Sequence, residues 1–355
     1  MAQEQIAVFR ALQLGDLLCA VPALRSLRHG KPGARITLVG LPWARDFVER
    51  MPYVDDFIEF PGWHGMPERK PDLAGMSPFL DRVHERHFDL AIQLHGSGTL
   101  TNPLLSLFGA RRMAGFYLAG RVSPDPETFI PWPEDRPEIR RLLALTEHLG
   151  LPDCGEALEL PILPREKEEW EALHASLTLG SRGYVCIHPG ARLASRRWLP
   201  ARFAQVADQL AAQGLSVLLT GTAAEAPLLA SIRQAMRRPA IDLAGHTSLG
   251  TLAALVASAR LVVCNDTGMS HVAAAVGTPS VVVSSGADAV RWQPLDTERH
   301  RVLWHAVPCR PCAWDDCPTQ HECAAGISTG AVVDASLTLL SRSSSHPEGT
   351  HHDAE

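Results

Sequence analysis

Residues 261–283 read LVVCNDTGMSHVAAAVGTPSVVV: an apolar run, a polar turn, an alanine-rich stretch and a second apolar run. Apolar runs of this length are typical of buried parallel strands, and the alanine-rich composition favours a helix between them. Gly277, Thr278 and Pro279 end that helix, because glycine and proline interrupt helical backbone. The stretch therefore predicts a strand–helix–strand unit of a parallel α/β sheet.

The polar turn inside this stretch, Asn265–Gly268, predicts an anion cradle. The first N–H groups of a helix have no partner within it, and the helix dipole is positive at the same end. Phosphate groups bind readily at such ends. Asp266 and Thr267 are also good N-cap residues, so the turn equally fits an ordinary capped helix. His271 lies one turn further along.

Composition describes a protein with a sizeable core. The 355 residues are 46% hydrophobic and 20% charged, which predicts two domains of ordinary size and excludes global disorder. The net charge of −6 argues against a nucleic-acid partner. No apolar run reaches the ~18–20 residues that cross a bilayer, and the N-terminal run over 6–12 is too short for a signal peptide. We expect a cytoplasmic protein, with peripheral membrane contact left open.

The chain alternates strand and helix patterns in two halves. The first half predicts strands over 6–12, 36–40, 57–60 and 90–94, with helices over 17–29, 43–50 and 136–149. The second predicts strands over 184–188, 216–220 and 241–243, with helices over 201–213 and 248–259, ahead of the opening stretch. Proline-rich sequence predicts a surface loop over 61–78 and a linker over 160–165.

This alternation predicts parallel sheets wrapped by helices. We expect an N-terminal domain over 1–160 and a C-terminal domain over 161–342, with a cleft between them. The tail over 343–355, rich in serine, histidine and acidic residues, is expected to be disordered.

Ligands of open parallel sheets bind at the carboxyl ends of the strands, so the turns there matter most. In the second half these turns carry hydroxyl, amide and guanidinium groups, the chemistry that holds a diphosphate. Arg196 follows one strand, Thr247 follows another, and the cradle follows a third. Arg196 fits a surface charge equally well. Glu225 fits a contact to a ribose diol, or a simple charge at a helix N-terminus.

The first half has no G-x-G-x-x-G, which argues against a nicotinamide oxidoreductase. It has Gly15-Asp16 on the turn after its first strand instead. Asp16 fits an N-cap, or a general base that removes a proton from an attacking hydroxyl. Arg140 and Arg141 offer positive charge to an anionic acceptor, or are ordinary surface charges.

Four of the eight cysteines lie close together near the C-terminus: Cys309, Cys312, Cys317 and Cys323, spaced C-x2-C-x4-C-x5-C. This spacing is tight enough for a structural tetrathiolate site holding zinc or iron. It equally fits a reduced, proline-rich loop whose thiols pack. No activating pattern surrounds these thiols, so we do not expect them to be catalytic.

Taken together, these residues resemble glycosyltransferase family 9, the ADP-heptose:lipopolysaccharide heptosyltransferase family. Four places carry the resemblance: Leu14-Gly15-Asp16 with Pro22-Ala23-Leu24; His188-Pro189-Gly190 with Arg196 and Trp198; Gly221 to Glu225; and Asn265 to His271. The last of these is the most specific.

The resemblance implies a GT-B fold: two facing Rossmann-like domains with parallel sheets and an inter-domain cleft, the first for the acceptor and the second for the donor. It implies inverting, metal-independent transfer of a sugar, a heptose from ADP-heptose, to a hydroxyl of a lipopolysaccharide-core-type or other glycan acceptor. Asp16 matches the family's catalytic base, and Arg196 stands where the family often has lysine.

With the strand-end argument, this gives an expected set of site residues. Asp16 is the catalytic base; Gly15, Arg140 and Arg141 contact the acceptor; Arg196, Glu225, Thr247, Asp266, Thr267, Gly268 and His271 contact the donor. The expected partners are a nucleotide sugar and an anionic glycan or glycolipid at the cytoplasmic face of the inner membrane. A nucleotide-sugar epimerase of GT-B architecture and a non-catalytic sugar-nucleotide-binding protein fit the same residues.

Overall fold

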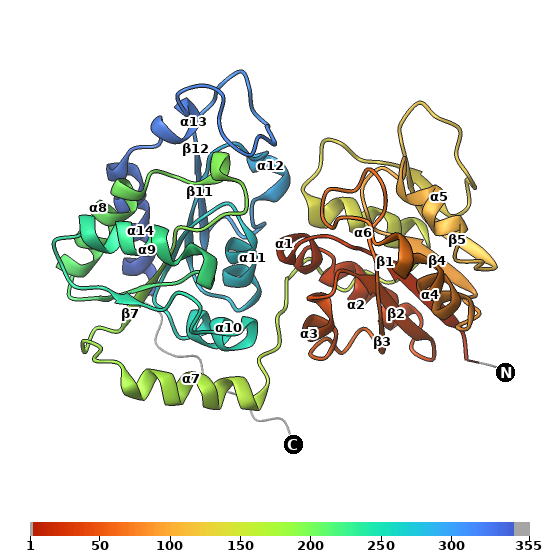
Figure 1. Ribbon diagram of the computed structural model, residues 1–355, viewed down its shortest axis with the longest axis horizontal. Helices are drawn as coiled ribbons and strands as arrows, with labels where there is room; N and C mark the ends of the chain where they lie inside the picture. Colours follow the sequence, from red (N-terminus) through yellow and green to blue (C-terminus); the bar gives the residue numbers. More distant parts are fainter. Residues whose placement is uncertain (1–2, 344–355) are drawn as a thin grey trace. The chain divides into compact units, whose positions relative to one another are not determined.

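The computed structural model describes residues 3–343, in two compact units (Figure 1). The first unit ends at Pro161 and the second begins at Ile162. Each holds one six-stranded sheet in which all strands run parallel. This confirms the predicted α/β class with two parallel sheets.

The first sheet has the strand order β3-β2-β1-β4-β5-β6. Its strands are β1 (Gln5–Phe9), β2 (Arg35–Gly40), β3 (Asp56–Glu59), β4 (Leu90–Gln93), β5 (Arg112–Tyr117) and β6 (Phe129–Pro131). The helices of this unit are α1 (Leu14–Leu18), α2 (Val21–Gly30), α3 (Ala44–Val48), α4 (Leu73–His84), α5 (Thr101–Ser106) and α6 (Glu138–His148).

The second sheet has the order β12-β11-β10-β7-β8-β9. Its strands are β7 (Tyr184–His188), β8 (Ser216–Leu219), β9 (Ile241–Asp242), β10 (Val262–Asn265), β11 (Ser280–Ser284) and β12 (His300–Trp304). Its α-helices are α7 (Pro164–Ser176), α8 (Pro200–Ala212), α9 (Ala226–Ala235), α10 (Leu249–Ala257), α11 (Gly268–Ala275), α12 (Ala289–Trp292), α13 (Glu322–Ala325) and α14 (Thr329–Ser343), and two short 3-10 helices are η1 (Ala194–Arg196) and η2 (Ala223–Glu225).

The opening stretch forms β10, α11 and β11, as its pattern predicts. Every residue of both strands is buried, because a parallel strand at this place in the sheet has helices or neighbours on both faces. Val263, Val281 and Val283 belong to the main hydrophobic core of this unit. The valine-rich runs thus form the centre of the second sheet.

In each sheet the strand order reverses beside the strand that comes first in the chain. β1 lies between β2 and β4, and β7 lies between β8 and β10. A reversal of this kind opens a crevice above the carboxyl ends of the two strands, where α/β sheets bind ligands. We therefore expect the ligand sites at the turns after β1 and β4, and after β7 and β10.

The structure differs from the predicted elements in several places. Strand β1 ends at Phe9 rather than at residue 12, and helices α5, α7, α12, α13 and α14 were not predicted. The predicted helix over 17–29 is two helices, since α1 begins at Leu14 and α2 at Val21. The segment 61–78, predicted as a loop, becomes helical at Leu73, where the side chain of Asp72 accepts the N–H of Gly75 at 3.0 Å. Strands β5, β6 and β12 were not predicted, because they lie toward the sheet edges and only part of each is buried.

The two predicted boundary segments can also be placed. The predicted linker over 160–165 spans the change of unit, and α7 begins within it at Pro164. Ser343, the first residue of the predicted disordered tail, is the last residue of α14, and the rest of that tail lies outside the described residues. Between residues 3 and 343, no helix is long and apolar enough to span a bilayer.

Candidate functional site

Helix α11 begins directly after β10, where the order of the second sheet reverses. Thr267 precedes it in an extended conformation (φ −147°, ψ −178°), and its side chain does not cap the helix. The Thr267 hydroxyl instead donates to the carbonyl oxygen of Asn265 at 3.5 Å. The N-terminal end of α11, beginning at Gly268, therefore presents its positive potential without a side-chain cap.

Asn265 holds the two turns at this crevice together. Its side chain is fully buried; Nδ2 donates to the carbonyl oxygen of Pro189 at 2.6 Å, and Oδ1 accepts the backbone N–H of Trp198 at 2.8 Å. These bonds join the end of β10 to the turn after β7. Asn265 thus fixes the position of the cradle relative to the turn after β7.

Arg196, the last residue of η1, brings a guanidinium group into this region. Its Nη2 donates to the carbonyl oxygen of Cys312 at 3.0 Å, while its Nε is buried and has no hydrogen-bond partner in the described structure. Arg196 also interacts electrostatically with Asp266. A buried N–H without an acceptor costs free energy, so this arrangement is typical of a site that a ligand completes.

The carboxyl group of Asp266 lies among several polar groups. Its Oδ2 accepts the hydroxyl hydrogen of Ser284 at 3.0 Å. Burial raises the pKa of Asp266, and the Ser284 hydroxyl together with Arg196 and Arg310 opposes that rise. Asp266 therefore lies within electrostatic reach of both arginines beside the cradle.

Glu225 lies beside the turn that follows β7. Its Oε2 accepts the backbone N–H and the hydroxyl of Thr222, at 2.8 and 2.9 Å, and so caps η2. A Cβ atom at Gly190 would lie 2.0 Å from Oε1 of Glu225, so only glycine leaves room for this carboxylate. The capping role is therefore observed, and Oε1 points at the strand-end turn where a ribose contact is expected.

Thr247 lies half-buried in the turn between β9 and α10. The same turn is joined to the Glu225 loop, because Gly245 donates its N–H to the carbonyl oxygen of Gly221 at 2.9 Å. Strand β9 is the sheet edge, three strand spacings or about 14 Å from β10. The structure thus groups Thr247 with Glu225 rather than with the cradle.

His271 lies in α11, one turn after the cradle, and its side chain is only 3% exposed. Its ring packs edge-on against Trp292, with ring centroids 6.4 Å apart. The structure therefore places His271 in the packing between α11 and α12, where it supports the helix that carries the cradle.

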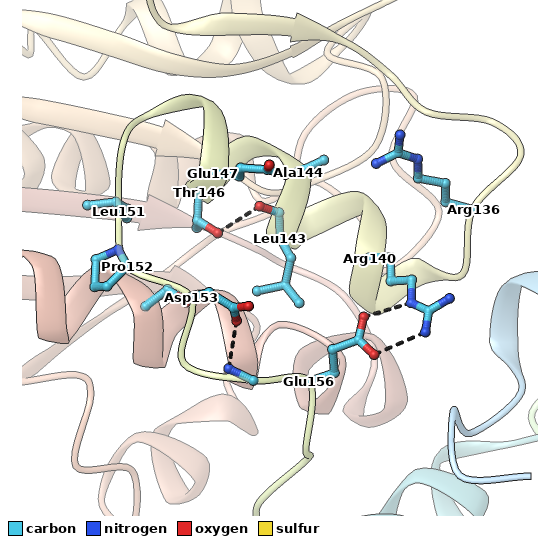
Figure 2. A pocket seen from close by; sticks show the side chains of 12 residues that line it. Arg136, Arg140, Leu143, Ala144, Thr146, Glu147, Leu151, Pro152, Asp153 and Glu156 are labelled. Carbon is cyan, nitrogen blue, oxygen red and sulfur yellow. Dashed lines mark hydrogen bonds and ion pairs between the residues drawn. The ribbon is translucent and has the colours of Figure 1, made fainter.

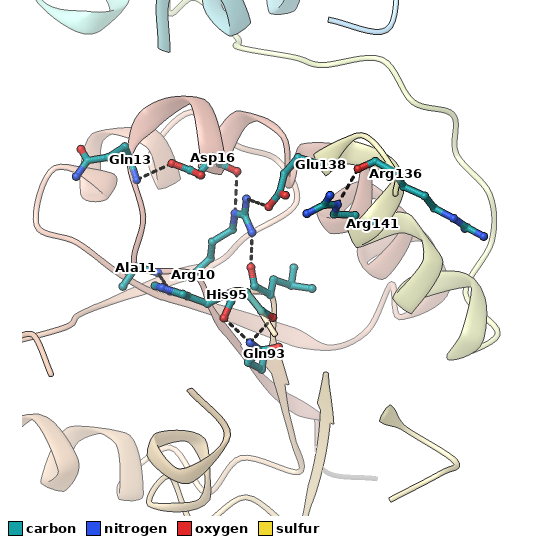
Figure 3. Close-up of polar contacts among 11 residues, drawn as sticks. Arg10, Ala11, Gln13, Asp16, Gln93, His95, Arg136, Glu138 and Arg141 are labelled. Atoms are coloured by element: carbon teal, nitrogen blue, oxygen red, sulfur yellow. Dashed lines mark hydrogen bonds and ion pairs between the residues drawn. The ribbon is translucent and has the colours of Figure 1, made fainter. Parts of the chain in front are cut away.

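Asp16 lies in α1, on the turn after β1 at the reversal of the first sheet. Its Oδ2 accepts the backbone N–H of Gln13 at 3.2 Å, and its backbone carbonyl accepts Nε–H of Arg10 at 2.7 Å (Figure 3). Gly15 is buried, and its carbonyl oxygen accepts the N–H of Cys19. Asp16 is thus held in place through both its side chain and its main chain.

A buried ion pair lies directly under this turn. Nη2 of Arg10 lies 3.1 Å from Oε1 of Glu138, and the two side chains are 0% and 1% exposed. Arg10 also donates to the carbonyl oxygen of Leu94, at the end of β4. Neither Arg10 nor Glu138 was predicted as part of the site. The one signal in the sequence is the charged residue Arg10 directly after an apolar strand.

His95 completes the same edge of the first sheet. Its ring stacks on Phe9 with centroids 5.3 Å apart, and its Nδ1 accepts the N–H of Ala11 at 3.3 Å. Burial, helped by the positive charge of Arg10, lowers the pKa of His95 to about 3. The imidazole is therefore neutral at physiological pH, and its contribution is packing and acceptance of a backbone bond.

Arg140 and Arg141 lie in different surroundings. Arg140 forms two bonds to Glu156, at 2.7 and 3.1 Å, and both side chains line an open cavity of about 560 Å³ (Figure 2). Arg141 is buried, donates to the carbonyl oxygen of Arg136 at 2.7 Å and lies over the ring of Trp132. The guanidinium of Arg141 is therefore bound to the loop that precedes its own helix, and its acceptor contact stays a prediction.

The four clustered cysteines line one small cavity of about 30 Å³. All four are free thiols, and no group of three or more histidine, cysteine, aspartate or glutamate side chains between residues 3 and 343 is placed to hold a metal ion. The predicted zinc or iron site at Cys309, Cys312, Cys317 and Cys323 therefore does not fit this arrangement. Cys323 is buried, Cys312 and Cys317 are half-buried, and Cys309 is exposed.

Comparison with known proteins agrees with this geometry. The family model for glycosyltransferase family 9 (heptosyltransferase) matches residues 78–322. Lipooligosaccharide heptosyltransferase 2 of Haemophilus influenzae is 37% identical over 110 residues, 30% of this chain and 32% of that protein. The chain thus matches about a third of that curated relative.

Two solved structures resemble the whole chain. A glycosyltransferase family 9 protein from Veillonella parvula has a TM-score of 0.79 at 21% identity, with 96% of this chain and 99% of that one covered. The ADP-heptose heptosyltransferase II of Escherichia coli has a TM-score of 0.75 at 22% identity, with 97% and 100% covered. These likenesses show the fold, which is the predicted GT-B fold.

Proposed function

Because this chain belongs to glycosyltransferase family 9, we propose that it transfers a heptose from ADP-heptose to a hydroxyl group of a lipopolysaccharide-core-type acceptor. The observation that carries the proposal is the buried Nε of Arg196, which has no hydrogen-bond partner. It lies in the region of the α11 N-terminus, which no side chain caps. A diphosphate would satisfy both.

We assign the donor to the second unit, over the predicted 161–342. The N–H groups at Thr267 and Gly268 and the guanidinium of Arg196 would bind the diphosphate, because charge-assisted hydrogen bonds to phosphate are strong. Glu225 and Thr247, on the other side of the sheet reversal, would face the nucleoside. As the bond between the sugar and the diphosphate breaks, the same groups stabilise the negative charge that develops on the leaving oxygen.

We assign the acceptor to the first unit, with Asp16 as the general base. The acceptor hydroxyl oxygen forms a bond to the anomeric carbon while the bond from that carbon to the diphosphate breaks, and the hydroxyl proton passes to the Asp16 carboxylate. A single displacement of this kind inverts the anomeric centre. Gly15 and Arg140 are proposed acceptor-side residues, and the acceptor is an anionic glycan or glycolipid reached from the cytoplasmic face of a membrane.

A thermal-shift screen of nucleotides and nucleotide sugars tests the proposal first, since a ligand that binds only the folded state raises the apparent melting temperature. ADP and ADP-heptose are expected to raise it, and the uridine and guanosine analogues less. Incubation of ADP-heptose with a core-oligosaccharide acceptor is then expected to release ADP and extend the glycan. Formation of an epimer without acceptor would favour the epimerase, and binding without any reaction the non-catalytic protein.

Arg196→Ala is expected to weaken ADP binding by ~1.5–3 kcal/mol, the range for a hydrogen bond to a charged group. Titration calorimetry measures this directly. Arg192→Ala is the matched control, because Arg192 is exposed in the same loop, and its ADP affinity should equal that of the unchanged protein. Equal affinity in the Arg196 variant would remove this residue from the donor site.

Removal of divalent cations is expected to leave transfer unchanged, since the sequence has no D-x-D-like pair and arginine with a helix N-terminus can supply the positive charge. The rate of ADP release with and without EDTA checks this. A loss of rate that added magnesium restores would contradict metal independence.

A further inference from the structure

The cysteine-containing segment over 305–323, here called the cysteine loop, runs from the end of β12 into the first turn of α13 in the second unit (Figure 1). Its four thiols do not form a metal site, and the proposed reaction does not use them. The loop nevertheless contacts the end of β11, whose Ser284 binds Asp266, and η1, which carries Arg196. The side chains of Arg310 and His321 and the backbone of the loop make these hydrogen bonds, and the sulfur atoms make none of them.

Arg310 ties the cysteine loop to the end of β11. Its Nη1 donates to the carbonyl oxygen of Ser284 at 2.6 Å, and its Nη2 donates to Ser284 Oγ at 3.2 Å and to the carbonyl oxygen of Ala287 at 2.6 Å. The Ser284 hydroxyl in turn donates to Asp266. A continuous chain of hydrogen bonds therefore runs from Arg310 through Ser284 to the cradle.

The backbone of Cys312 makes a second connection. Its N–H donates to the carbonyl oxygen of Gly286 at 2.8 Å, and its carbonyl oxygen accepts Nη2 of Arg196 at 3.0 Å. A Cβ atom at Gly286 would lie only 2.6 Å from the sulfur of Cys312, so the loop can approach this closely only over a glycine. The carbonyl group of Cys312 therefore helps to orient the guanidinium group of Arg196.

A third set of contacts holds the residue before Arg196. The backbone N–H of Ser195 donates to the carbonyl oxygen of Asp315 at 3.1 Å, and its hydroxyl donates to the carbonyl oxygen of Trp314. Nε2 of His321 donates to the carbonyl oxygen of Ser195 at 2.8 Å. The cysteine loop therefore binds η1 at both Ser195 and Arg196.

From these contacts we propose that the cysteine loop sets the geometry of the donor diphosphate site, and that Arg310 is its positioning residue. Arg310 acts through Ser284 on Asp266, and the Cys312 peptide acts on Arg196. The inference rests on the proposed function for the identity of the ligand, an adenosine diphosphate. It assigns the thiols no chemical step.

The test compares Arg310→Gln and Arg310→Lys with the unchanged protein. Glutamine removes the charge and the forked donor set, so ADP is expected to bind about tenfold more weakly, within the range of ordinary site-to-site coupling. The KM for the donor should rise more than kcat falls. Lysine keeps the charge but not the fork and should restore part of the affinity. Arg299→Gln is the control, because Arg299 forms an exposed ion pair with Asp296, and this variant should bind ADP normally.

Two further variants distinguish the contribution of the Cys312 backbone from that of its thiol. They also keep the test decisive if Arg310→Gln fails to fold. Gly286→Ala pushes Cys312 away and should weaken ADP binding, whereas Cys312→Ser keeps the peptide bonds and should not. Normal ADP affinity in Arg310→Gln or in Gly286→Ala would overturn the proposal, as would loss of affinity in Cys312→Ser alone. If the unchanged protein binds no ADP, the proposed function fails instead.

Discussion

Asp16→Asn is expected to lower kcat for heptose transfer by about 10²- to 10⁴-fold, the usual contribution of a general base. Asparagine has the shape of aspartate, and its Oδ1 can still accept the Gln13 N–H that Asp16 accepts at 3.2 Å. The contact from Arg10 is to the backbone carbonyl and is unaffected by the change. The variant therefore removes basicity while it keeps the local structure.

Steady-state rates together with ADP titration measure this effect. ADP affinity should be unchanged, because the donor is assigned to the other unit. Asp16→Ala is the second variant, and it should lose as much rate and in addition about 1 kcal/mol of stability, because the helix-capping bond is lost. Equal loss of binding and of rate in Asp16→Asn would identify Asp16 as a structural residue.

Glu138→Ala is expected to lower the free energy of unfolding by about 3–5 kcal/mol, since removing one partner of a buried ion pair leaves the other charge uncompensated. Arg10 would keep its bonds to two backbone carbonyls but lose its counter-charge. Urea denaturation followed by tryptophan fluorescence measures the change. Because Arg10 also holds the Asp16 turn, the folded variant should lose turnover but bind ADP normally.

The matched control for this prediction is Glu156→Ala. Glu156 pairs with Arg140 through two bonds, but both side chains are exposed, at 41% and 52%. Exposed pairs contribute about 0–1 kcal/mol, so this variant should unfold almost like the original protein. Similar losses in the two variants would mean that burial of the Arg10–Glu138 pair is not what stabilises this unit.

Parts of this protein could be predicted because they depend on neighbouring residues. The run that becomes β10, α11 and β11 carries its own periodicity, its helix-stopping glycine and proline, and its polar turn. The same local signals predicted strands at β1 and β7, although β1 ends three residues before the predicted residue 12, and hence the regions of Asp16 and Arg196. The outer strands β6 and β12 were not predicted, because partial burial leaves their sequences without a clear apolar pattern.

The sequence by itself therefore determined the α/β class, the order of most strands and helices, and the turn between β10 and α11 in which the predicted cradle lies. Tertiary structure alone decided which charges work together. Arg10 meets Glu138 across 128 residues, and Arg196 meets Cys312 across 116. It also buried Arg141 and set the backbone of the cysteine loop, not its sulfur, against η1. The local sequence pattern indicates whether a segment is helix or strand. A hydrogen bond between distant residues depends on their separation in space, and only the packing of the sheets and helices determines that separation.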